Sequence, residues 1–307
     1  MARKNPVKRS VRLRAFAKVN LCLHVVGKRT DGYHELRTIF QTISLHDTLE
    51  LSLTSPDQIS FETTDLHIPK GPENLVWRAI DVMRSELGIF GGIHARLEKR
   101  IPVARGLGGG SSDAAAALIG MLRLTKNLTK NKLPLERLIE IAASLGADVP
   151  FFIFGGRALG VGRGDEIYPL ADAPKRSILV VSPREIGVST KDAYQWLSAE
   201  LTNERLTHKI HGFCALCWSR PGAGVSNDFE GPVFRRHPRL GEIRAGLLER
   251  GAADAALAGS GSAVFGVFRN PAQARRAARE FPADSVFVAE TLSREDYRRA
   301  VGWRASG

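Results

Sequence analysis

The stretch PVARGLGGGSSDAAAAL, residues 102–118, places four glycines within five positions, followed by two serines, an aspartate and a run of alanines. A strand-like segment precedes it, and the alanines favour a helix after it. Backbone amides with no side chains in the way can converge on phosphate oxygens, and a helix N-terminus adds unpaired N–H groups and a partial positive charge. We therefore expect this stretch to bind phosphate, and a flexible turn with a serine cap is the simpler alternative.

The serines of this loop have two possible uses. Ser111 or Ser112 can cap the helix, and their hydroxyls can also reach a phosphate or its Mg²⁺. Two better-known nucleotide loops do not fit. The Gly-Lys pair at 27–28 lacks the glycine five positions earlier that a Walker loop needs, and the sixth position of a dinucleotide fingerprint counted from Gly106 is Ser111 and not glycine. The protein-kinase catalytic-loop and Asp-Phe-Gly signatures are absent as well.

The composition is that of a folded globular protein with a strong basic bias. The 307 residues suffice for two domains, and no apolar run reaches the length of a membrane span. The net charge, 44 − 32 = +12, admits a nucleic-acid-binding protein. However, the basic residues are scattered without a nucleic-acid-binding signature, and positive charge equally suits an enzyme with polyphosphate substrates.

The N-terminus and the cysteines indicate where the protein works. Residues 1–14 are basic with no apolar segment behind them, which predicts a solvated tail and not a secretory signal or a nucleic-acid arm. Three cysteines are too few for a disulfide scaffold and favour a reducing cytoplasm. We expect a cytoplasmic monomer or weak homodimer that binds a small-molecule substrate and neither nucleic acid nor membrane.

Hydrophobic periodicity predicts alternating strand pairs and helices on both sides of a boundary near residue 170. The first half has predicted strands at 12–27, a strand pair within 37–53, a strand at 92–102 and a hairpin at 151–170, with helices at 74–88, after the glycine loop and before Gly146. The second half has predicted strands at 176–183, 254–268 and 285–292 and helices at 189–201, 239–252, 271–281 and 293–301. This mixture favours an α+β fold with domains 1–170 and 171–307 over a single doubly wound sheet.

Three ordered motifs resemble those of the GHMP kinases, which include galactokinase, homoserine kinase and mevalonate kinase. The glycine loop resembles their phosphate-binding motif, AFAKVNLCLHVVGKRTDGYHEL at 15–36 their N-terminal motif, and LAGSGSAVFGVF at 257–268 their C-terminal glycine-rich motif. The resemblance implies an N-terminal domain with a left-handed crossover and a ferredoxin-like C-terminal domain, with the active site in the cleft.

A narrower likeness concerns the acceptor. The pairing of AKVNL with DGYHEL, followed by GADVPFF, resembles the branch of the family that phosphorylates the 2-hydroxyl of a cytidine diphosphate ester of methylerythritol, in the non-mevalonate route to isoprenoid precursors. The resemblance implies ATP as co-substrate together with Mg²⁺. The alternatives are a homoserine-type or mevalonate-type kinase, neither of which has a cytidine to hold, and a binding protein that has lost catalysis.

The resemblance also implies roles for individual residues. Lys18 and Asp148 match the catalytic pair, which is chemically sound because an aspartate can accept the proton of an alcohol while a lysine keeps it ionised and polarises the acceptor oxygen. The ATP-binding set comprises Pro102, Val103, Ala104, Arg105, Gly106, Leu107, Gly108, Gly109, Gly110, Ser111 and Ser112, with Asn74 and Lys99 near the adenine or phosphates. The substrate-binding set comprises Asn20, Tyr33, His34, Tyr194, Gly259, Ser260 and Gly261.

One further constellation could indicate a metal. His208, His211, Cys214 and Cys217 recur at every third position, and all four are of types that bind zinc. Four ligands on one continuous helix cannot easily surround a tetrahedral ion. We expect no metal there and regard the cysteines as small core residues.

Overall fold

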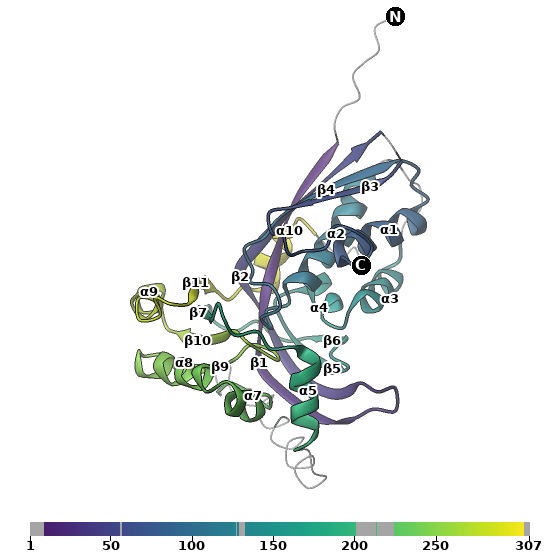
Figure 1. The fold of residues 1–307 in the computed structure, drawn as a ribbon. Coiled ribbons are helices and arrows are strands. Elements are labelled where there is room, and N and C mark those ends of the chain that lie inside the picture. The colour runs from purple at the N-terminus through teal and green to yellow at the C-terminus, as the bar shows by residue number, and fades with distance from the viewer. Residues whose placement is uncertain are drawn as a thin grey trace, which may run out of the picture.

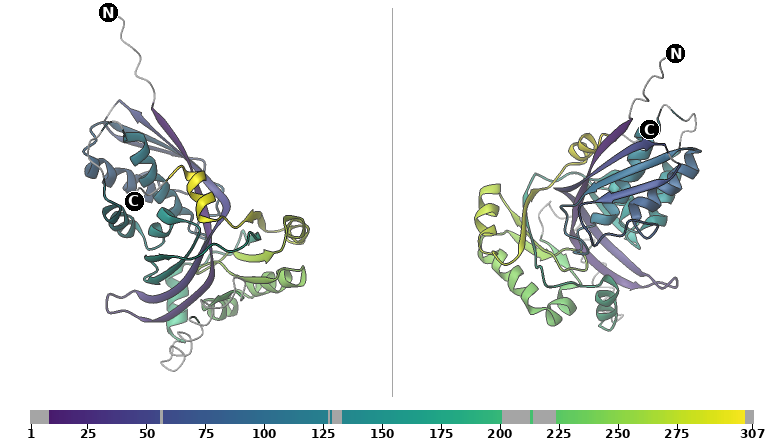
Figure 2. Two further views of the ribbon diagram at one scale, coloured as in Figure 1. Left: turned by 180° about the vertical axis from the view of Figure 1, so that it is seen from behind. Right: turned by 45° about the horizontal axis from the view of Figure 1, so that its top comes forward.

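Two β-sheets organise the residues described by this computed structural model, which are 9–55, 57–126, 128, 133–200, 213 and 224–303 (Figure 1). The larger sheet has seven strands, in which β3-β4-β2-β1-β8 form one path and β5 joins β2 to β6. The smaller sheet has the order β11-β7-β10-β9. Figure 2 shows the first sheet with its helices and the second sheet with its own lying side by side, joined by the long strands.

The long strands β1 (Ser10–Lys28) and β2 (His34–Thr54) form the backbone of the larger sheet. They pair antiparallel over their whole length, with register shifts at three points along β1. The predicted strand pair within 37–53 is therefore wrong, because this segment is part of a single strand. It contains neither glycine nor proline, and it pairs with β5 (Arg157–Gly162) over its first half and β4 (Gly92–Glu98) over its second.

Four helices cover the larger sheet and enclose the main apolar core. The glycine loop is followed, as predicted, by a helix, and this helix is buried along most of its length between the sheet and its neighbours. The helices of this layer are α1 (Leu75–Leu87), α2 (Gly109–Thr125), α3 (Leu135–Leu145) and α4 (Val149–Phe154). The prediction of a strand at 151–154 is wrong, since a short and almost wholly buried apolar run gives no periodicity by which to tell helix from strand. The predicted hairpin is instead β5 with β6 (Glu166–Pro169).

Strand β3 (Ile59–Thr63) pairs in parallel with β4, and α1 lies between them in the chain. The chain between these two parallel strands therefore forms a crossover connection. Helix α1 begins at its cap residue Asn74 and ends at Gly88, which adopts a left-handed φ of 62°.

The smaller sheet has the ferredoxin-like arrangement. Its elements follow the order β-α-β-β-α-β, with α7 and α8 following α5 in the first connection, and the two strands that are adjacent in sequence form the hairpin at one end. They are β7 (Ser177–Ser182), α5 (Thr190–Ser198), α7 (Glu230–Arg236), α8 (Pro238–Glu249), β9 (Asp254–Leu257), β10 (Val264–Phe268), α9 (Pro271–Ala278) and β11 (Ser285–Glu290). Patterning predicted most of them but missed α7.

Two segments of the second half return to the first. The two-residue strand β8 (Ser226–Asn227) pairs in parallel with β1 and so joins the larger sheet. Helix α10 (Arg294–Val301) packs on β1, where the rings of Tyr297 and Phe16 lie 5.6 Å apart. The domain boundary near residue 170 stays a prediction. Two elements from beyond it, β8 and α10, pack against β1 of the first half.

Candidate active site

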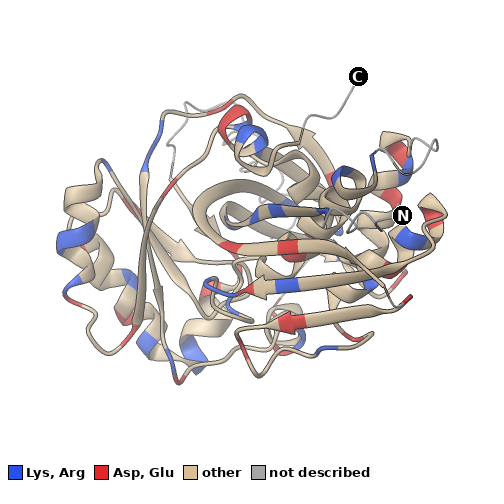
Figure 3. Ribbon diagram, turned by 90° about the horizontal axis from the view of Figure 1, so that it is seen from above, with Lys and Arg blue, Asp and Glu red and all other residues tan. Residues whose placement is uncertain are grey.

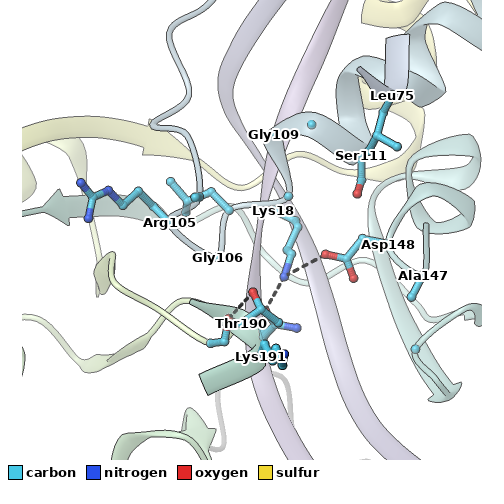
Figure 4. A pocket seen from close by; sticks show the side chains of 18 of the residues that line it. Lys18, Leu75, Arg105, Gly106, Gly109, Ser111, Ala147, Asp148, Thr190 and Lys191 are labelled. Carbon is cyan, nitrogen blue, oxygen red and sulfur yellow. Dashed lines mark hydrogen bonds and ion pairs between the residues drawn. The ribbon is translucent and has the colours of Figure 1, made fainter. Parts of the chain in front are cut away.

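A cavity of about 1080 Å³ opens where the glycine loop, the β1–β2 pair and α5 meet (Figure 4). Residues from all three sequence motifs line it, although they are far apart in the chain. Of the predicted site residues, the cavity brings together Lys18, Asn20, Tyr33, His34, Asn74, Lys99, Pro102, Val103, Ala104, Arg105, Gly106, Leu107, Gly108, Gly109, Gly110, Ser111, Asp148, Tyr194, Gly259 and Ser260. Ser112 and Gly261 do not line it and are buried behind the surface.

Lys18 and Asp148 face each other across the cavity. The Lys18 ammonium lies 3.4 Å from Asp148 Oδ2, and the side chain of Lys18 is 5% exposed while that of Asp148 is 32% exposed (Figure 4). Lys18 also lies over the Phe40 ring, 5.4 Å from its centroid. Asp148 follows α3 in the turn that starts α4, so its carboxylate stands at the edge of the open space. The pair therefore consists of a buried ammonium and a carboxylate that a ligand in the cavity can reach.

A chain of hydrogen bonds orients Asn20, which lies beside Lys18. Lys18 Nζ donates to Asn20 Oδ1 at 2.8 Å, and Asn20 Nδ2 donates to Thr38 Oγ1 at 2.8 Å. Thr38 Oγ1 in turn donates to the Cys22 carbonyl at 2.7 Å, so it can only accept from Asn20. Thr38 therefore fixes the Asn20 amide with its oxygen toward Lys18. Apart from its place on the buried face of a strand, nothing in the pattern of residues indicates Thr38 as part of a site.

The glycine loop contacts the strand that carries Lys18 and the helix that carries Phe152. Its Leu107 carbonyl accepts from the Lys18 backbone N–H at 3.0 Å. Gly106 and Gly108 have φ values of 77° and 71°, a region that favours glycine. A Cβ on Gly108 would lie 2.9 Å from the Phe152 ring, so neither conformation nor space admits a side chain there.

Helix α2 starts at this loop without a serine cap. Gly108 occupies the cap position, and no side chain bonds to the first amides, so the predicted capping by Ser111 or Ser112 is wrong. Ser111 lines the cavity, whereas the Ser112 hydroxyl is buried without a hydrogen-bond partner. The uncapped amides and the dipole of a 17-residue helix are therefore directed at the cavity.

Lys99 lies behind the loop in a buried ionic cluster that patterning missed. Its ammonium contacts Asp47 Oδ2 at 2.5 Å and Asp113 Oδ2 at 2.8 Å. Asp47 also accepts from the backbone N–H groups of Arg100 and Ile101. Burial raises the pKa of Asp113, and the Asp47 carboxylate adds to this rise although Lys99 opposes it. The charge of Lys99 is thus already compensated, and its neighbours tie β2 and the end of β4 to the start of α2.

Asn74 also has a structural use in addition to its place in the cavity lining. Its Oδ1 accepts from Val76 N at 2.8 Å, which caps α1, and its Nδ2 donates to the Pro69 carbonyl at 2.7 Å. Each polar atom already makes one hydrogen bond, so one N–H of Nδ2 and one lone pair of Oδ1 remain for a ligand.

Aromatic rings form the other end of the cavity. The His34 and Tyr194 rings stack with centroids 4.8 Å apart, and Tyr33 is 55% exposed beneath the Arg163 guanidinium. His34 Nε2 lies 2.6 Å from Ser198 Oγ, which itself donates to the Tyr194 carbonyl. Because the single hydroxyl proton of Ser198 is used, His34 donates from Nε2 and leaves Nδ1 as an acceptor. Burial, with a smaller effect of Lys28, lowers the pKa of His34 and favours this neutral form.

The charge distribution is mixed. Figure 3 shows Lys and Arg positions on several elements, with Asp and Glu positions among them. In the part of the chain that the structure describes, no helix has the length and apolarity to cross a membrane. The described residues contain no group of three or more His, Cys, Asp or Glu placed to hold a metal ion. His208, His211, Cys214 and Cys217 lie outside the described residues.

Comparisons with known proteins agree with this geometry. Residues 74–156 match the model of the GHMP kinases N-terminal domain, and residues 210–285 match that of the GHMP kinases C-terminal domain. The 4-diphosphocytidyl-2-C-methyl-D-erythritol kinase of Solibacter usitatus is 46% identical over 96% of this chain and 92% of its own length. That of Geobacter sulfurreducens is 42% identical over 90% of this chain and 96% of its own.

Solved structures of kinases are also similar to this chain. A crystal structure of 4-(cytidine 5'-diphospho)-2C-methyl-D-erythritol kinase is similar with a TM-score of 0.72 and 35% identity, covering 92% of this chain and 99% of that one. A homoserine kinase from Cytophaga hutchinsonii has a TM-score of 0.70 at 18% identity, covering 95% of this chain and 98% of that one, which indicates a shared fold alone.

Proposed function

The chain belongs to the 4-diphosphocytidyl-2-C-methyl-D-erythritol kinases of the GHMP kinase family, and on this premise we propose that it transfers the γ-phosphoryl group of ATP to the 2-hydroxyl of 4-diphosphocytidyl-2-C-methyl-D-erythritol. The observation that carries the proposal is the Lys18–Asp148 pair, 3.4 Å apart, between the glycine loop and the aromatic end of one cavity. The two ends suit two different ligands, and the pair stands where their reacting groups would meet.

ATP binds at the glycine-loop end. The backbone amides of the loop and the uncapped start of α2 hold the phosphates. Ile68, Leu75 and Leu97 line the same end and provide an apolar surface for the adenine. Lys99 supports the loop from behind, because its ammonium already bonds to two carboxylates.

Mg²⁺ fits the chemistry of this end. Ser111 presents its hydroxyl to the cavity, and a Cβ on Gly146 would lie 3.9 Å from Ser111 Oγ, so this hydroxyl is close to the segment that carries Asp148. Hard oxygen donors of this kind, completed by phosphates and water, are what Mg²⁺ takes. When bound, Mg²⁺ neutralises charge on the phosphoryl oxygens.

The cytidine binds at the aromatic end. Tyr33 and Tyr194 offer ring faces for a pyrimidine, and neutral His34 offers an acceptor at Nδ1 for an exocyclic amine. His34 now stacks on Tyr194, so the base enters either beside this pair or by displacing the imidazole. Arg163 and Lys28 line the same region and provide charge for a diphosphate.

The chemical step uses the pair at the centre. Asp148 accepts the proton of the 2-hydroxyl as the hydroxyl oxygen attacks the γ-phosphorus, and the bond from that phosphorus to the β-γ bridging oxygen breaks to release ADP. Lys18 stabilises the charge that develops, and Asn20 holds the lysine in place through its Oδ1. Positioning supplies much of the rate enhancement in reactions of this type.

A coupled ADP-release assay over a panel of alcohols tests the proposal. The panel comprises 4-diphosphocytidyl-2-C-methyl-D-erythritol, methylerythritol phosphate, homoserine and mevalonate. We expect turnover to require the cytidine diphosphate group, because its binding energy is used at the reacting centre. Equal turnover of homoserine or mevalonate would overturn the substrate assignment.

A further inference from the structure

Asn227, in the two-residue strand β8, makes three side-chain hydrogen bonds, all of them to backbone groups. Its Nδ2 donates to the Leu257 carbonyl at 2.8 Å and to the Gly259 carbonyl at 2.7 Å. Its Oδ1 accepts from Phe229 N at 2.9 Å. The residue is 7% exposed and does not line the cavity. Only an amide supplies two donors and an acceptor in this arrangement.

The two carbonyls belong to the turn that carries the C-terminal glycine motif. This turn meets the phosphate loop, since a Cβ on Gly106 would lie 1.8 Å from the Ala258 carbonyl oxygen. From the same turn, Ser260 lines the cavity, and its hydroxyl lies 3.1 Å from that of Thr190. The place of this turn therefore determines the shape of the cavity beside the ATP loop.

The third hydrogen bond leads to the aromatic end. Phe229, whose N–H bonds to Asn227, packs edge-on against Tyr194 with centroids 4.8 Å apart, and Tyr194 stacks on His34. The strand itself is fixed to β1, where Asn227 pairs with Leu23. One buried amide thus joins the catalytic strand, the glycine turn and the ring that supports the aromatic end.

We propose that Asn227 is a positioning residue for phosphoryl transfer, which holds the 257–261 turn in register with the ATP loop and with the acceptor. The inference rests on the proposed function. Asn227 touches neither substrate, so its effect passes through Ser260 and Gly106. Misplacement of reacting groups by about 1 Å costs on the order of 10²-fold in rate, and we expect an effect on kcat more than on binding.

The test compares Asn227→Asp and Asn227→Ala with Asn270→Ala in the ADP-release assay. Asp keeps the acceptor for Phe229 but aims a carboxylate at two carbonyl oxygens, whereas Ala removes all three bonds. Asn270 caps α9 through its side chain, is exposed and does not line the cavity, so its replacement removes an asparagine hydrogen bond outside the site. Thermal unfolding of each variant gives the folded fraction at the assay temperature.

We expect both Asn227 variants to lose at least about tenfold in kcat per folded molecule, with each KM changed less than about threefold. Asn227→Asp should regain part of its kcat as the pH falls, because a protonated carboxyl can donate one hydrogen bond, and Asn227→Ala should not. Asn270→Ala should keep the wild-type kcat. Normal kcat in folded Asn227→Ala, or a loss that only follows the folded fraction, overturns the proposal.

A second measurement uses the wild-type chain and so does not depend on how the variants fold. The side-chain NH₂ signals of Asn227 in a ¹⁵N NMR spectrum should be protected from solvent exchange and should shift when a non-hydrolysable ATP analogue binds. Signals that exchange freely, or that do not respond, overturn the proposal. Failure of the wild-type enzyme to phosphorylate the cytidine substrate would instead count against the proposed function.

Discussion

Gly106 and Ala258 are in direct backbone contact, since a Cβ added to Gly106 would lie 1.8 Å from the Ala258 carbonyl oxygen. The contact joins the glycine loop of the first half of the chain to the glycine turn of the second. Gly106 also has a φ of 77°, so both space and conformation require glycine. The two glycine-rich motifs are therefore parts of one wall of the cavity.

The first prediction concerns this contact. Gly106→Ala should lower the free energy of unfolding by about 1–2 kcal/mol for the left-handed φ and by a further 1–3 kcal/mol for the clash. Gly251→Ala is the matched control, because Gly251 has a φ of 89° but nothing within 4 Å of its Cβ position. Urea unfolding measures both. Equal losses of unfolding free energy in the two variants would show that the contact between Gly106 and Ala258 places no extra constraint on a side chain.

The second prediction concerns the ATP phosphates. Gly110 lines the cavity, and its Cβ position has only Leu75 nearby, at 3.9 Å, whereas those of Gly108 and Gly109 point into protein. Gly110→Val should therefore keep the fold and raise the ATP KM by tenfold or more, because the side chain competes with phosphate for the loop amides. The KM of the cytidine substrate and the melting temperature serve as internal controls. An unchanged ATP KM would show that phosphate binds elsewhere.

The third prediction concerns the chemical step. Asp148→Asn should lower kcat by about 10²–10⁴-fold while both KM values change little, because basicity is lost but shape is kept. Lys18→Met should also lower kcat, and the double variant should lose much less than the product of the single losses if the pair acts as a unit. Titration with Mg²⁺ separates the roles: recovery of the Asp148→Asn rate at high Mg²⁺ would mean that Asp148 positions the metal and is not a base.

The fourth prediction concerns Lys99. Lys99→Met leaves Asp47 and Asp113 buried without their cation and should cost about 3–5 kcal/mol of unfolding free energy. The loss should be larger at pH 8 than at pH 5.5, because protonation relieves the repulsion of the two carboxyls. Adding Asp113→Asn should restore part of the stability. Lys175→Met, which breaks the exposed pair with Glu290, should cost less than about 1 kcal/mol. If Lys99→Met raised the ATP KM with no loss of stability, Lys99 would be a nucleotide ligand.

The fifth prediction concerns pH and stability. Burial disfavours the charged form of His24, but hydrogen bonds to Asp228 and Cys22 outweigh it and raise the pKa of His24 to about 9. Since the folded pKa lies above the unfolded one, the stabilisation is fully present below about pH 6.5 and is lost as the pH rises through 9. We expect a loss on the order of 1–2 kcal/mol, reduced by solvent screening.

The free energy of unfolding, measured between pH 6 and 10 for the wild type and two variants, tests this pH dependence. His24→Gln should flatten the profile over this range. His67→Gln is the control, because the His67 side chain is 95% exposed and its replacement should leave the wild-type profile unchanged. A parallel profile in His24→Gln would show that the Asp228 contact contributes no pH-dependent stability.

Local patterning predicted most elements because their boundaries depend on near neighbours. The end of α1 at Gly88 and the cap of α5 at Ser189 follow from backbone and side-chain bonds within a few residues. Where patterning failed, distant contacts decide the conformation. The single long strand β2 is held by β1, β4 and β5 together, and Phe151, Phe152 and Ile153 of α4 are buried in the core.

The sequence by itself determined the family, the order of the three motifs and the residue types at the site, because glycine runs and motif spacing are properties of the chain alone. Only the tertiary structure decided which of these side chains have polar atoms available to a ligand and which use them within the protein. It placed Lys99 between Asp47 and Asp113, used Asn74 as a helix cap, removed Ser112 from the cavity and gave Asn227 its three bonds. Such pairings depend on atoms that come within 3 Å only when distant strands and turns pack together, and no local pattern encodes that distance.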